Sequence, residues 1–521
     1  MLKSLCCFVC IMVLVTVLSV VSSAAAVKDT LVIGLQDDVA SLDPAKTYET
    51  AAAGIISLTY ETLVDFDRDD LSKTIPKVAE SWKVGEDGKT WTFYIRKGIT
   101  FASGNPVNSE AVVFSLQRSL KLGNWILPQF GVSEKSITAL DDYRVQIVLD
   151  QQYAPGLFLA CFVHISTRII DPMVMQYEQK GDMGSAWLEE HSAGSGAYIL
   201  ESRKREAPTE YTLNANNDYW GTKPKFRKIV IKGIQESVEQ MLMLEQGEID
   251  IAWNLQPDQT MMLSSNPDIR ISETLLFYIT WIVMNQGYPP LTVPEVRDAV
   301  RYAIDYDGIV GNILQGAGEK IQTFIPKGLS GYNPAMPYNR DLERAKQLLA
   351  TGGYPDGFAV ELKCLDYSPW LDIAQKVKAD LAQIGIQVTI HSMNGDRLIK
   401  ANMSRESQML LWEWGPDYAD PDSYARPFAH SDSPDDDASV KLLAWWNRYV
   451  NKETSTLIEQ AAQEFDSQKR VQLYHQITEI ILDDGPYAIL YSPIKQYGMR
   501  SELTGLIIPP TSMLFPFPPV K

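Results

Sequence analysis

The chain has 521 residues, of which 45% are hydrophobic and 21% are charged, as expected for a globular protein with about two or three domains. The 65 acidic side chains outnumber the 47 basic ones, which gives a formal net charge of −18. Because nucleic-acid binding and docking on anionic lipid both require a basic surface, this balance argues against both functions.

The first 26 residues are predicted to form a secretory signal peptide. Lys3 precedes the apolar run Leu5–Val21, and the small residues that follow end in an Ala-x-Ala site, so cleavage is expected after Ala26. An uncleaved membrane anchor is the alternative, because the apolar run approaches the roughly 18 to 20 residues that span a bilayer. The small residues directly after the run favour cleavage, and no cysteine follows them to accept a lipid.

Predicted strands and helices are mixed along the mature chain, which indicates an α/β fold. In chain order, the apolar pattern predicts a strand at 31–35, a helix at 48–62, a strand at 91–96, a helix at 109–120 capped by Asn108, and strands at 144–149, 211–214 and 228–232. Further helices begin at Pro294, at the cap Asn339 and at Ser368-Pro369, a strand follows at 386–390, and two helices are expected within 454–483. Since the sequence shows no repeat and no low-complexity linker, domains joined by several short crossings are expected.

Cys161 and Cys364 are the cysteines that remain after signal cleavage. Two cysteines cannot form a disulfide framework for a chain of this size, so the hydrophobic core must hold the fold together. One bridge and two separately buried thiols are both compatible with the sequence.

No complete catalytic or metal-binding motif is present in the sequence. The five histidines are too widely spaced for a local zinc pair, and no phosphate-binding loop occurs. Gly194-Ser195-Gly196 resembles part of a nucleophile elbow, but the full G-x-S-x-G pattern is missing, so a glycine-rich turn before a strand at Tyr198 is expected. The sequence therefore predicts a binding protein rather than an enzyme, without a metal or a cofactor.

In residues 410–424 an apolar strand runs into a Gly-Pro turn that carries aromatic side chains and three acids, Asp417, Asp420 and Asp422. Loops at strand ends carry ligand sites in α/β proteins. Aromatic walls beside a carboxylate suit a ligand with an ammonium group. The alternative is that the tryptophans belong to the core and that the acids only shape the turn, and the residues alone leave both interpretations open.

Short motifs occur in a fixed order along almost all of residues 30–505. They are, in one-letter code, LDP at 42–44, YETLV at 60–64, PKVAESW at 76–82, DGKTWTF at 87–93, IRKGITF at 95–101, GSGAY at 194–198, NDYWG at 217–221, GEID at 247–250 and VRDAVRYAID at 296–305. As an ordered set, these motifs resemble the family 5 extracellular solute-binding proteins, the oligopeptide and dipeptide receptors of ABC importers. One departure is Ala111, where the family usually has an acid before paired valines.

The resemblance implies a two-lobed periplasmic-binding-protein fold of three domains, with the lobes joined by two hinge crossings. Domain I would be discontinuous, domain II would be inserted in it, and domain III would form the opposite lobe. The implied boundaries are 27–71, 192–277 and 487–521 for domain I, 72–191 for domain II and 278–486 for domain III, with crossings near 277–282 and 484–487. Such lobes close on a ligand by hinge motion and bury it between them.

The implied function is that of the substrate-binding receptor of an ABC importer, which captures peptides between two closing lobes and delivers them to a permease in the inner membrane. Such a receptor is periplasmic and is expected to be a monomer. The acid that binds the α-ammonium group of a peptide in this family falls on Asp417. Main-chain groups of Gly415 would pair with the peptide backbone, and Trp414 and Tyr418 would line side-chain pockets.

A receptor of the same fold for a non-peptide ligand is the alternative, and that ligand would be an oligosaccharide, a nickel complex or an opine. The 12 Trp and 24 Tyr residues suit sugar rings, which stack on aromatic side chains, whereas Asp417 favours an amine-bearing ligand. Dipeptide-specialised members carry an arginine for the ligand carboxylate in a loop that matches 364–368, which has no basic residue here. Strict selection for dipeptides is therefore not expected.

Overall fold

The computed structural model of the protein describes residues 28–36, 39–47, 49–67, 70–506 and 508–511. The predicted signal peptide, residues 1–26, lies outside the described residues. Within the described ranges, none of the helices qualifies as a candidate membrane span.

A large mixed sheet of 12 strands extends through the molecule in the order β16-β15-β17-β13-β18-β11-β1-β10-β9-β8, and β12 and β14 pair with β18 beside this path. Its strands are β1 (Thr30–Leu35), β8 (Tyr198–Lys204), β9 (Glu210–Ala215), β10 (Lys228–Gly233), β11 (Ile251–Ala252), β12 (Ile269–Leu275), β13 (Ile279–Met284), β14 (Gly318–Lys320), β15 (Ala359–Leu365), β16 (Gln387–Met393), β17 (Met409–Trp414) and β18 (Tyr487–Arg500). β1 is parallel to β10 and β11, and β15 is parallel to β16 and β17.

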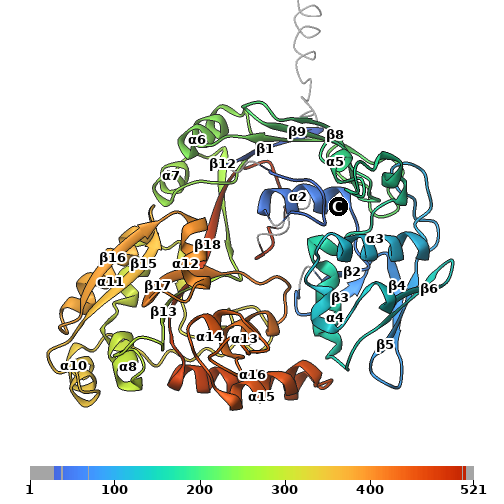
Figure 1. Ribbon diagram of the computed structural model, residues 1–521. Coiled ribbons are helices and arrows are strands. Elements are labelled where there is room, and N and C mark those ends of the chain that lie inside the picture. Colours follow the sequence, from blue (N-terminus) through green and yellow to red (C-terminus); the bar gives the residue numbers. More distant parts are fainter. Residues whose placement is uncertain (1–27, 37–38, 48, 68–69, 507, 512–521) are drawn as a thin grey trace, which may run out of the picture.

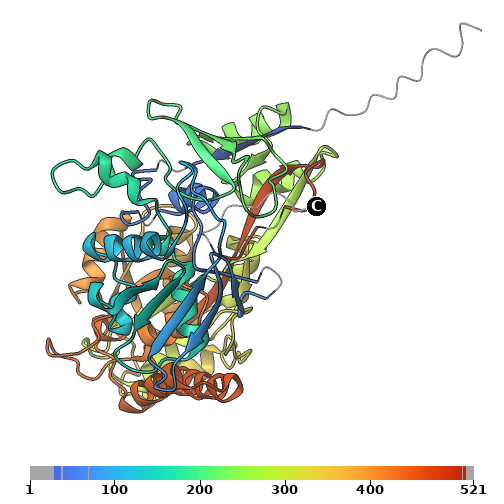
Figure 2. The same ribbon diagram turned by 90° about the vertical axis from the view of Figure 1, so that its right-hand side faces the viewer.

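The long strand β18 connects the two halves of this sheet. Its first residues pair with β13, and its last part pairs with β12, from Ile494 opposite Leu275 to Arg500 opposite Ile269. Figure 1 shows β18 rising from β13 towards β12 and β1, and Figure 2 shows β18 and β12 side by side. Since residues 276–278 link β12 directly to β13, this connection and β18 both join the halves.

A separate antiparallel sheet has the strand order β4-β5-β7-β6. Its strands are β4 (Ala79–Val84), β5 (Thr90–Ile95), β6 (Ile137–Asp141) and β7 (Arg144–Val148), and β2 (Val64–Phe66) and β3 (Thr74–Pro76) form a short ladder whose β3 contacts β4. Trp91, Phe93 and Ile95 of β5 are buried and alternate with partly exposed residues, as the sequence pattern predicts for a strand with one face on the core.

Helices cover these sheets. They are α2 (Thr50–Thr59), α3 (Ser109–Lys121), α4 (Pro155–Ala160), α5 (Ser185–Leu188), α6 (Ser237–Gln246), α7 (Pro257–Leu263), α8 (Pro294–Ala303), α9 (Tyr306–Gly308), α10 (Leu342–Thr351), α11 (Trp370–Ala382), α12 (Gly395–Met403), α13 (Asp422–Ala429), α14 (Leu443–Trp446), α15 (Lys452–Gln463) and α16 (Ser467–Asp484). α3 packs on β6 and β7, α11 packs on β15 and β16, and α13 packs on α15 and α16. Two short 3-10 helices, η3 (Cys161–Val163) and η4 (Ile165–Thr167), follow α4.

Most predicted elements are confirmed, and α3 shows why. The Asn108 side chain accepts the main-chain N–H of Ala111 at 3.0 Å, which satisfies one of the free donors at the helix start. Val112 and Leu116 of the predicted apolar face are fully buried. The predicted pair of helices within 454–483 is also present, as α15 and α16.

Two predicted helix boundaries are wrong. α2 ends at Thr59 instead of residue 62, because the Thr59 carbonyl accepts the N–H of Gly196 at 3.0 Å rather than continuing the helical pattern. α10 is capped by Asp341 and not by Asn339, since the Asp341 side chain accepts the main-chain N–H of Arg344 at 2.9 Å. In both cases a contact that the local pattern does not reveal decides where the helix begins or ends.

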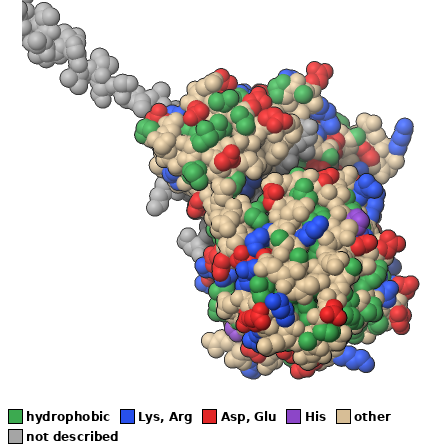
Figure 3. Space-filling view, turned by 90° about the vertical axis from the view of Figure 1, so that its left-hand side faces the viewer, with side chains coloured by type: hydrophobic (Ala, Val, Ile, Leu, Met, Phe, Trp, Pro, Cys, Tyr) green, Lys and Arg blue, Asp and Glu red, His purple; other side chains and the backbone are tan. Residues whose placement is uncertain are grey.

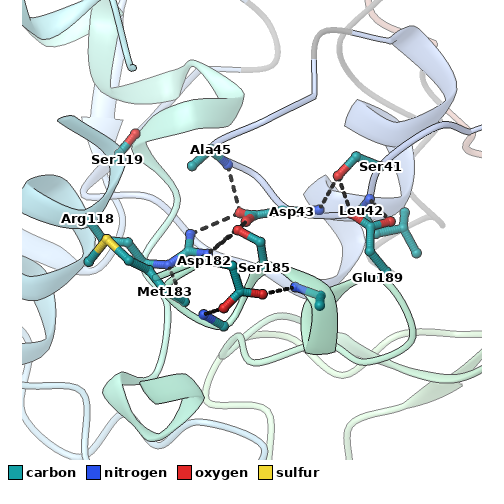
Figure 4. Close-up of polar contacts among 12 residues, drawn as sticks. Ser41, Leu42, Asp43, Ala45, Arg118, Ser119, Asp182, Met183, Ser185 and Glu189 are labelled. Atoms are coloured by element: carbon teal, nitrogen blue, oxygen red, sulfur yellow. Dashed lines mark hydrogen bonds and ion pairs between the residues drawn. The ribbon is translucent and has the colours of Figure 1, made fainter. Parts of the chain in front are cut away.

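A buried ion pair ties the segment after β1 to α3 and α5, and Figure 4 shows Asp43 between Arg118 and Ser185. Arg118 donates to both carboxylate oxygens of Asp43, at 2.9 and 2.7 Å. The Ser185 hydroxyl donates to the same carboxylate at 2.6 Å, and the N–H of Ala45 does so at 3.0 Å. Burial acts to raise the pKa of the Asp43 carboxyl, but the hydrogen bonds and charge of Arg118 outweigh burial, so this pKa lies below its usual value.

The two cysteines within the described residues are separate buried thiols. Cys161 lies in η3, next to α4, and Cys364 lies on β15 of the large sheet, and neither is part of a disulfide. Of the two possibilities that the sequence leaves open, the structure therefore supports two independent thiols, and the cohesion of the fold rests on its hydrophobic core.

Candidate ligand-binding site

The acidic turn, which we define as residues 414–424, connects the end of β17 to α13. β17 is buried in its first half and lies between β13 and β15, which fixes where the turn begins. Ser423 closes the turn: its hydroxyl accepts the main-chain N–H of Asp417 at 3.0 Å, and its carbonyl accepts the indole N–H of Trp414 at 3.1 Å. The position of Asp417 is therefore set by local hydrogen bonds.

The three acids of the turn have different surroundings. Asp420 accepts two hydrogen bonds from Arg470 of α16, both at 2.7 Å, and Asp422 pairs with Arg426 at 3.0 Å. These two carboxylates are structural, because they attach the turn to α16 and to the first turns of α13. The carboxylate of Asp417 has neither a hydrogen bond nor an ion pair with any residue in the described ranges.

Burial raises the pKa of the Asp417 carboxyl to about 7. A carboxylate that loses water without gaining a partner is costly, so burial destabilises the anion relative to the neutral acid, and the two forms are comparably populated near pH 7. An ammonium group that reached this carboxylate would form charge-assisted hydrogen bonds and stabilise the ionised form. The site is thus suited to bind a cationic group of a ligand.

Asp417 lines a small cavity of about 30 Å³ between the acidic turn and a distant part of the chain. We call the residues opposite the turn the facing wall. In Figure 1, β17 and α13 lie to the left of β2 and α4, near which the facing wall is found. The acidic turn contributes Pro416, Asp417, Tyr418 and Ala419, the facing wall consists of Phe66, Val163, His164, Ile165 and Arg168, and Thr511 completes the lining.

The facing wall is uncharged except for Arg168. Val163 and Ile165 are buried apolar residues on either side of His164. The Nδ1 atom of His164 lies 2.7 Å from the Ser166 hydroxyl, and burial, assisted by the charge of Arg168, lowers the pKa of His164 to about 3. The imidazole is therefore neutral at physiological pH, and Arg168 is the cation of this wall.

The structure brings Asp417 and Tyr418 together in the lining of the cavity, where Tyr418 is buried beside the carboxylate. Trp414 and Gly415 lie next to the cavity rather than in its lining. Trp414 is half-buried, and Gly415 packs so closely against the ring of Tyr278 that a Cβ atom would collide with it. The ligand contacts predicted for these four residues stay predictions.

Sequence reasoning does not identify the facing wall. Arg168 and Asp417 are 249 residues apart in the sequence, and only the fold brings both to one cavity. A weak signal is present, because Arg168 is the only Lys or Arg within residues 145–179, a largely apolar stretch. A lone cation in such a stretch is a candidate for a buried, specifically paired side chain.

The predicted glycine-rich turn before a strand is confirmed at residues 194–196. Ser195 is fully buried, the N–H of Gly196 donates to the Thr59 carbonyl, and β8 begins at Tyr198. In the described ranges, no three His, Cys, Asp or Glu side chains are grouped as metal ligands. On the face shown in Figure 3, acidic and basic side chains of the described residues are interspersed.

Comparison with known proteins relates most of the chain to solute-binding proteins. The sequence profile of the bacterial extracellular solute-binding proteins, family 5 (middle region), matches residues 73–436. Over 497 residues, the chain is 32% identical to a "Probable D,D-dipeptide-binding periplasmic protein" of Escherichia coli (strain K12), covering 94% of this chain and 93% of that protein. A dipeptide-binding protein of the same strain is 27% identical, with coverage of 89% and 88%.

A solved structure agrees with these relatives. The ABC transporter-associated periplasmic binding protein of Helicobacter pylori in complex with the peptide STSA superimposes with a TM-score of 0.78 at 26% identity, covering 94% of this chain and 98% of that chain. The predicted α/β fold of the periplasmic-binding-protein type is therefore confirmed.

Proposed function

The chain belongs to the family 5 bacterial extracellular solute-binding proteins, and from this membership we propose that it is the peptide-binding receptor of an ABC importer. It captures a peptide between two closing lobes in the periplasm and delivers it to a permease in the inner membrane. In this proposal the receptor is a monomer, performs no catalysis, and binds neither a cofactor nor nucleic acid.

The observation that carries the proposal is the unpaired carboxylate of Asp417 in a cavity between two distant parts of the chain. The N-terminus of a peptide is an ammonium group, and it would supply the counter-charge that the described residues do not provide. A neutral oligosaccharide would leave the carboxylate without compensation, which is unfavourable for a desolvated charge. The main chain of Gly415 would pair with the peptide backbone, and Trp414 and Tyr418 would contact its side chains.

The location of the cavity supports capture by closure. The acidic turn belongs to the proposed domain III, residues 278–486, and most of the facing wall belongs to the proposed domain II, residues 72–191. The proposed domain I comprises 27–71, 192–277 and 487–521, and hinge crossings are proposed near 277–282 and 484–487. A rotation about these crossings would change the distance between the two walls and so admit or enclose a ligand.

Export is part of this function, and we expect signal cleavage after Ala26. Edman sequencing or mass spectrometry of protein from the periplasm should find Val27 as the first residue. Replacing Ala24 and Ala26 with a bulky residue should block processing and leave the precursor at the membrane. Recovery of wild-type protein that still carries Met1 would contradict the prediction.

Ligand classes can be separated by thermal stability, because a ligand that binds only the folded state stabilises it. At a ligand concentration 100 times the dissociation constant, the gain is roughly 2.7 kcal/mol, which raises the melting temperature measurably. We expect such a shift with peptides of two to five residues and none with the same peptides N-acetylated, with cello-oligosaccharides, with opines or with Ni²⁺. A shift with sugars, opines or Ni²⁺ and none with any peptide would reverse the assignment in favour of a non-peptide receptor.

A further inference from the structure

Arg168 stands apart from the other buried arginines of the described chain. The arginines that are buried as whole residues are Arg118, Arg168, Arg297, Arg301 and Arg470. All except Arg168 donate to a carboxylate, namely Asp43, Asp484, Asp298 and Asp420. Arg168 is only 7% exposed, its Nε atom has no hydrogen-bond partner, and it forms no ion pair with any described residue.

The two acidic groups whose charges act on Arg168 already have other partners. Glu61 and Asp65 act to raise the pKa of Arg168, but burial outweighs them and lowers it. The Lys77 ammonium lies 3.2 Å from the Glu61 carboxylate and 3.8 Å from that of Asp65. The hydroxyl of Tyr219 donates to Glu61 at 2.6 Å as well, so both acids have partners other than Arg168.

Arg168 also lines the same cavity as Asp417, on the opposite wall. The lining therefore contains one unpaired anion from the acidic turn and one unpaired cation from the facing wall. Burial is the one cause that raises the pKa of Asp417, with no opposing contribution from Arg168, so the two groups do not neutralise each other in the free site. A ligand that carried both charges would satisfy both.

We propose that Arg168 binds the carboxylate of a ligand whose ammonium group binds at Asp417, so that the site selects short peptides with two free termini. This inference rests on the proposed function and adds to it the group that holds the far end of the ligand. A guanidinium presents a planar set of donors that can bind both oxygens of a carboxylate, which gives direction as well as attraction. The segment 364–368, which matches the loop that carries this arginine in dipeptide-specialised members of the family, has no basic residue to do this.

The test compares free peptides with their C-terminal amides, using calorimetry on the full mature protein. The probes are di-, tri- and tetra-alanine as free acids, the corresponding amides, and the N-acetylated acids. Wild-type protein is expected to bind the best free acid at least about 30-fold more tightly than its amide, as is typical when one partner of a buried charge pair is lost.

Arg168→Gln is expected to lose affinity for the free acid by a similar factor and to bind acid and amide equally. It should still reject the N-acetylated peptide, because that preference belongs to Asp417. Arg168→Lys keeps the positive charge but loses the planar donor geometry of the guanidinium, so it should show part of the wild-type preference for the acid over the amide. Arg397→Gln removes an exposed arginine of α12 and should leave every affinity unchanged.

The outcomes separate the two proposals. If wild type binds free peptides but does not distinguish acid from amide, Arg168 is not the carboxylate partner, although the peptide receptor stands. The same conclusion follows if Arg168→Gln retains the wild-type preference for the acid. If Arg168→Gln does not fold, as judged by circular dichroism, the acid-amide ratio of wild type still decides the question. If wild type binds none of the peptides, the proposed function fails, and the role of Arg168 fails with it.

Discussion

Asp417→Asn is expected to weaken peptide binding by about 2–5 kcal/mol, or roughly 30- to 4,000-fold in affinity. The substitution preserves the size of the side chain but removes the charge that would compensate a desolvated ammonium group. Isothermal titration calorimetry with an unmodified peptide measures the loss directly. N-acetylation of the peptide removes the other member of the pair, so the variant should show little further loss with acetylated peptides.

The same carboxyl makes binding depend on pH. In the free protein the pKa of Asp417 is about 7, whereas a bound ammonium requires the ionised form. Affinity should therefore fall as pH decreases below 7, by up to about tenfold per pH unit, and it should level off above pH 7. Asp417→Asn should show no such slope between pH 5 and 7. If the pH dependence of affinity persists in the variant, a group other than Asp417 causes it.

Stability provides the control for folding. An acid whose folded pKa is raised above its unfolded value costs stability as pH rises between these two values. Ligand-free Asp417→Asn should thus melt at the same temperature as wild type near pH 4 and at a higher one near pH 8. Asp420→Asn is the contrasting variant, since it leaves Arg470 of α16 unpaired and should destabilise the protein. Equal peptide affinity in wild type and Asp417→Asn would exclude Asp417 from the site.

Asp43→Asn is expected to lower the free energy of unfolding by about 3–5 kcal/mol, because it leaves the buried guanidinium of Arg118 without its counter-charge. Chemical denaturation at pH 7 followed by circular dichroism measures the change. Since Arg118 lowers the pKa of Asp43, the stabilisation is present above the usual aspartate pKa and is lost as pH falls through the lowered value.

An exposed Arg–Asp pair serves as the control. Arg144 lies 2.6 Å from Asp141, and both side chains are 48% exposed. Asp141→Asn should therefore cost less than about 1 kcal/mol. The double replacement Asp43→Leu with Arg118→Met removes both buried charges and should recover much of the stability lost by Asp43→Asn. Equal effects of the buried and the exposed substitution would show that Asp43 and Arg118 contribute no more than a surface pair.

The sequence predicts local elements well where local physics decides them. Asn108 and the apolar spacing of Val112 and Leu116 suffice to predict α3, because the cap and the buried face lie within a few residues of each other. The end of α2 could not be predicted in this way. It depends on Gly196, which approaches Thr59 only in the folded chain.

In the candidate site, too, local features could be predicted from the sequence, whereas contacts between distant residues could not. Spacing and residue type nominate all three acids of the turn, but they cannot tell which carboxylate is free. That distinction depends on Arg470, which reaches Asp420 from α16. Arg168 is predicted by no local motif, because its significance comes from the opposite wall and from the absence of a partner among the described residues.

The two isolated thiols have a consequence for how the protein is made. The thiolate is the form that oxidants and disulfide-exchange enzymes attack, and burial raises the pKa of Cys364 to about 11 and that of Cys161 above its usual value. Neither sulfur is therefore reactive once the chain has folded. Among the described residues no disulfide has to form during folding, so reducing agents are expected to leave this part of the native structure intact. The stability of the described fold is therefore expected to be the same under oxidising and reducing conditions.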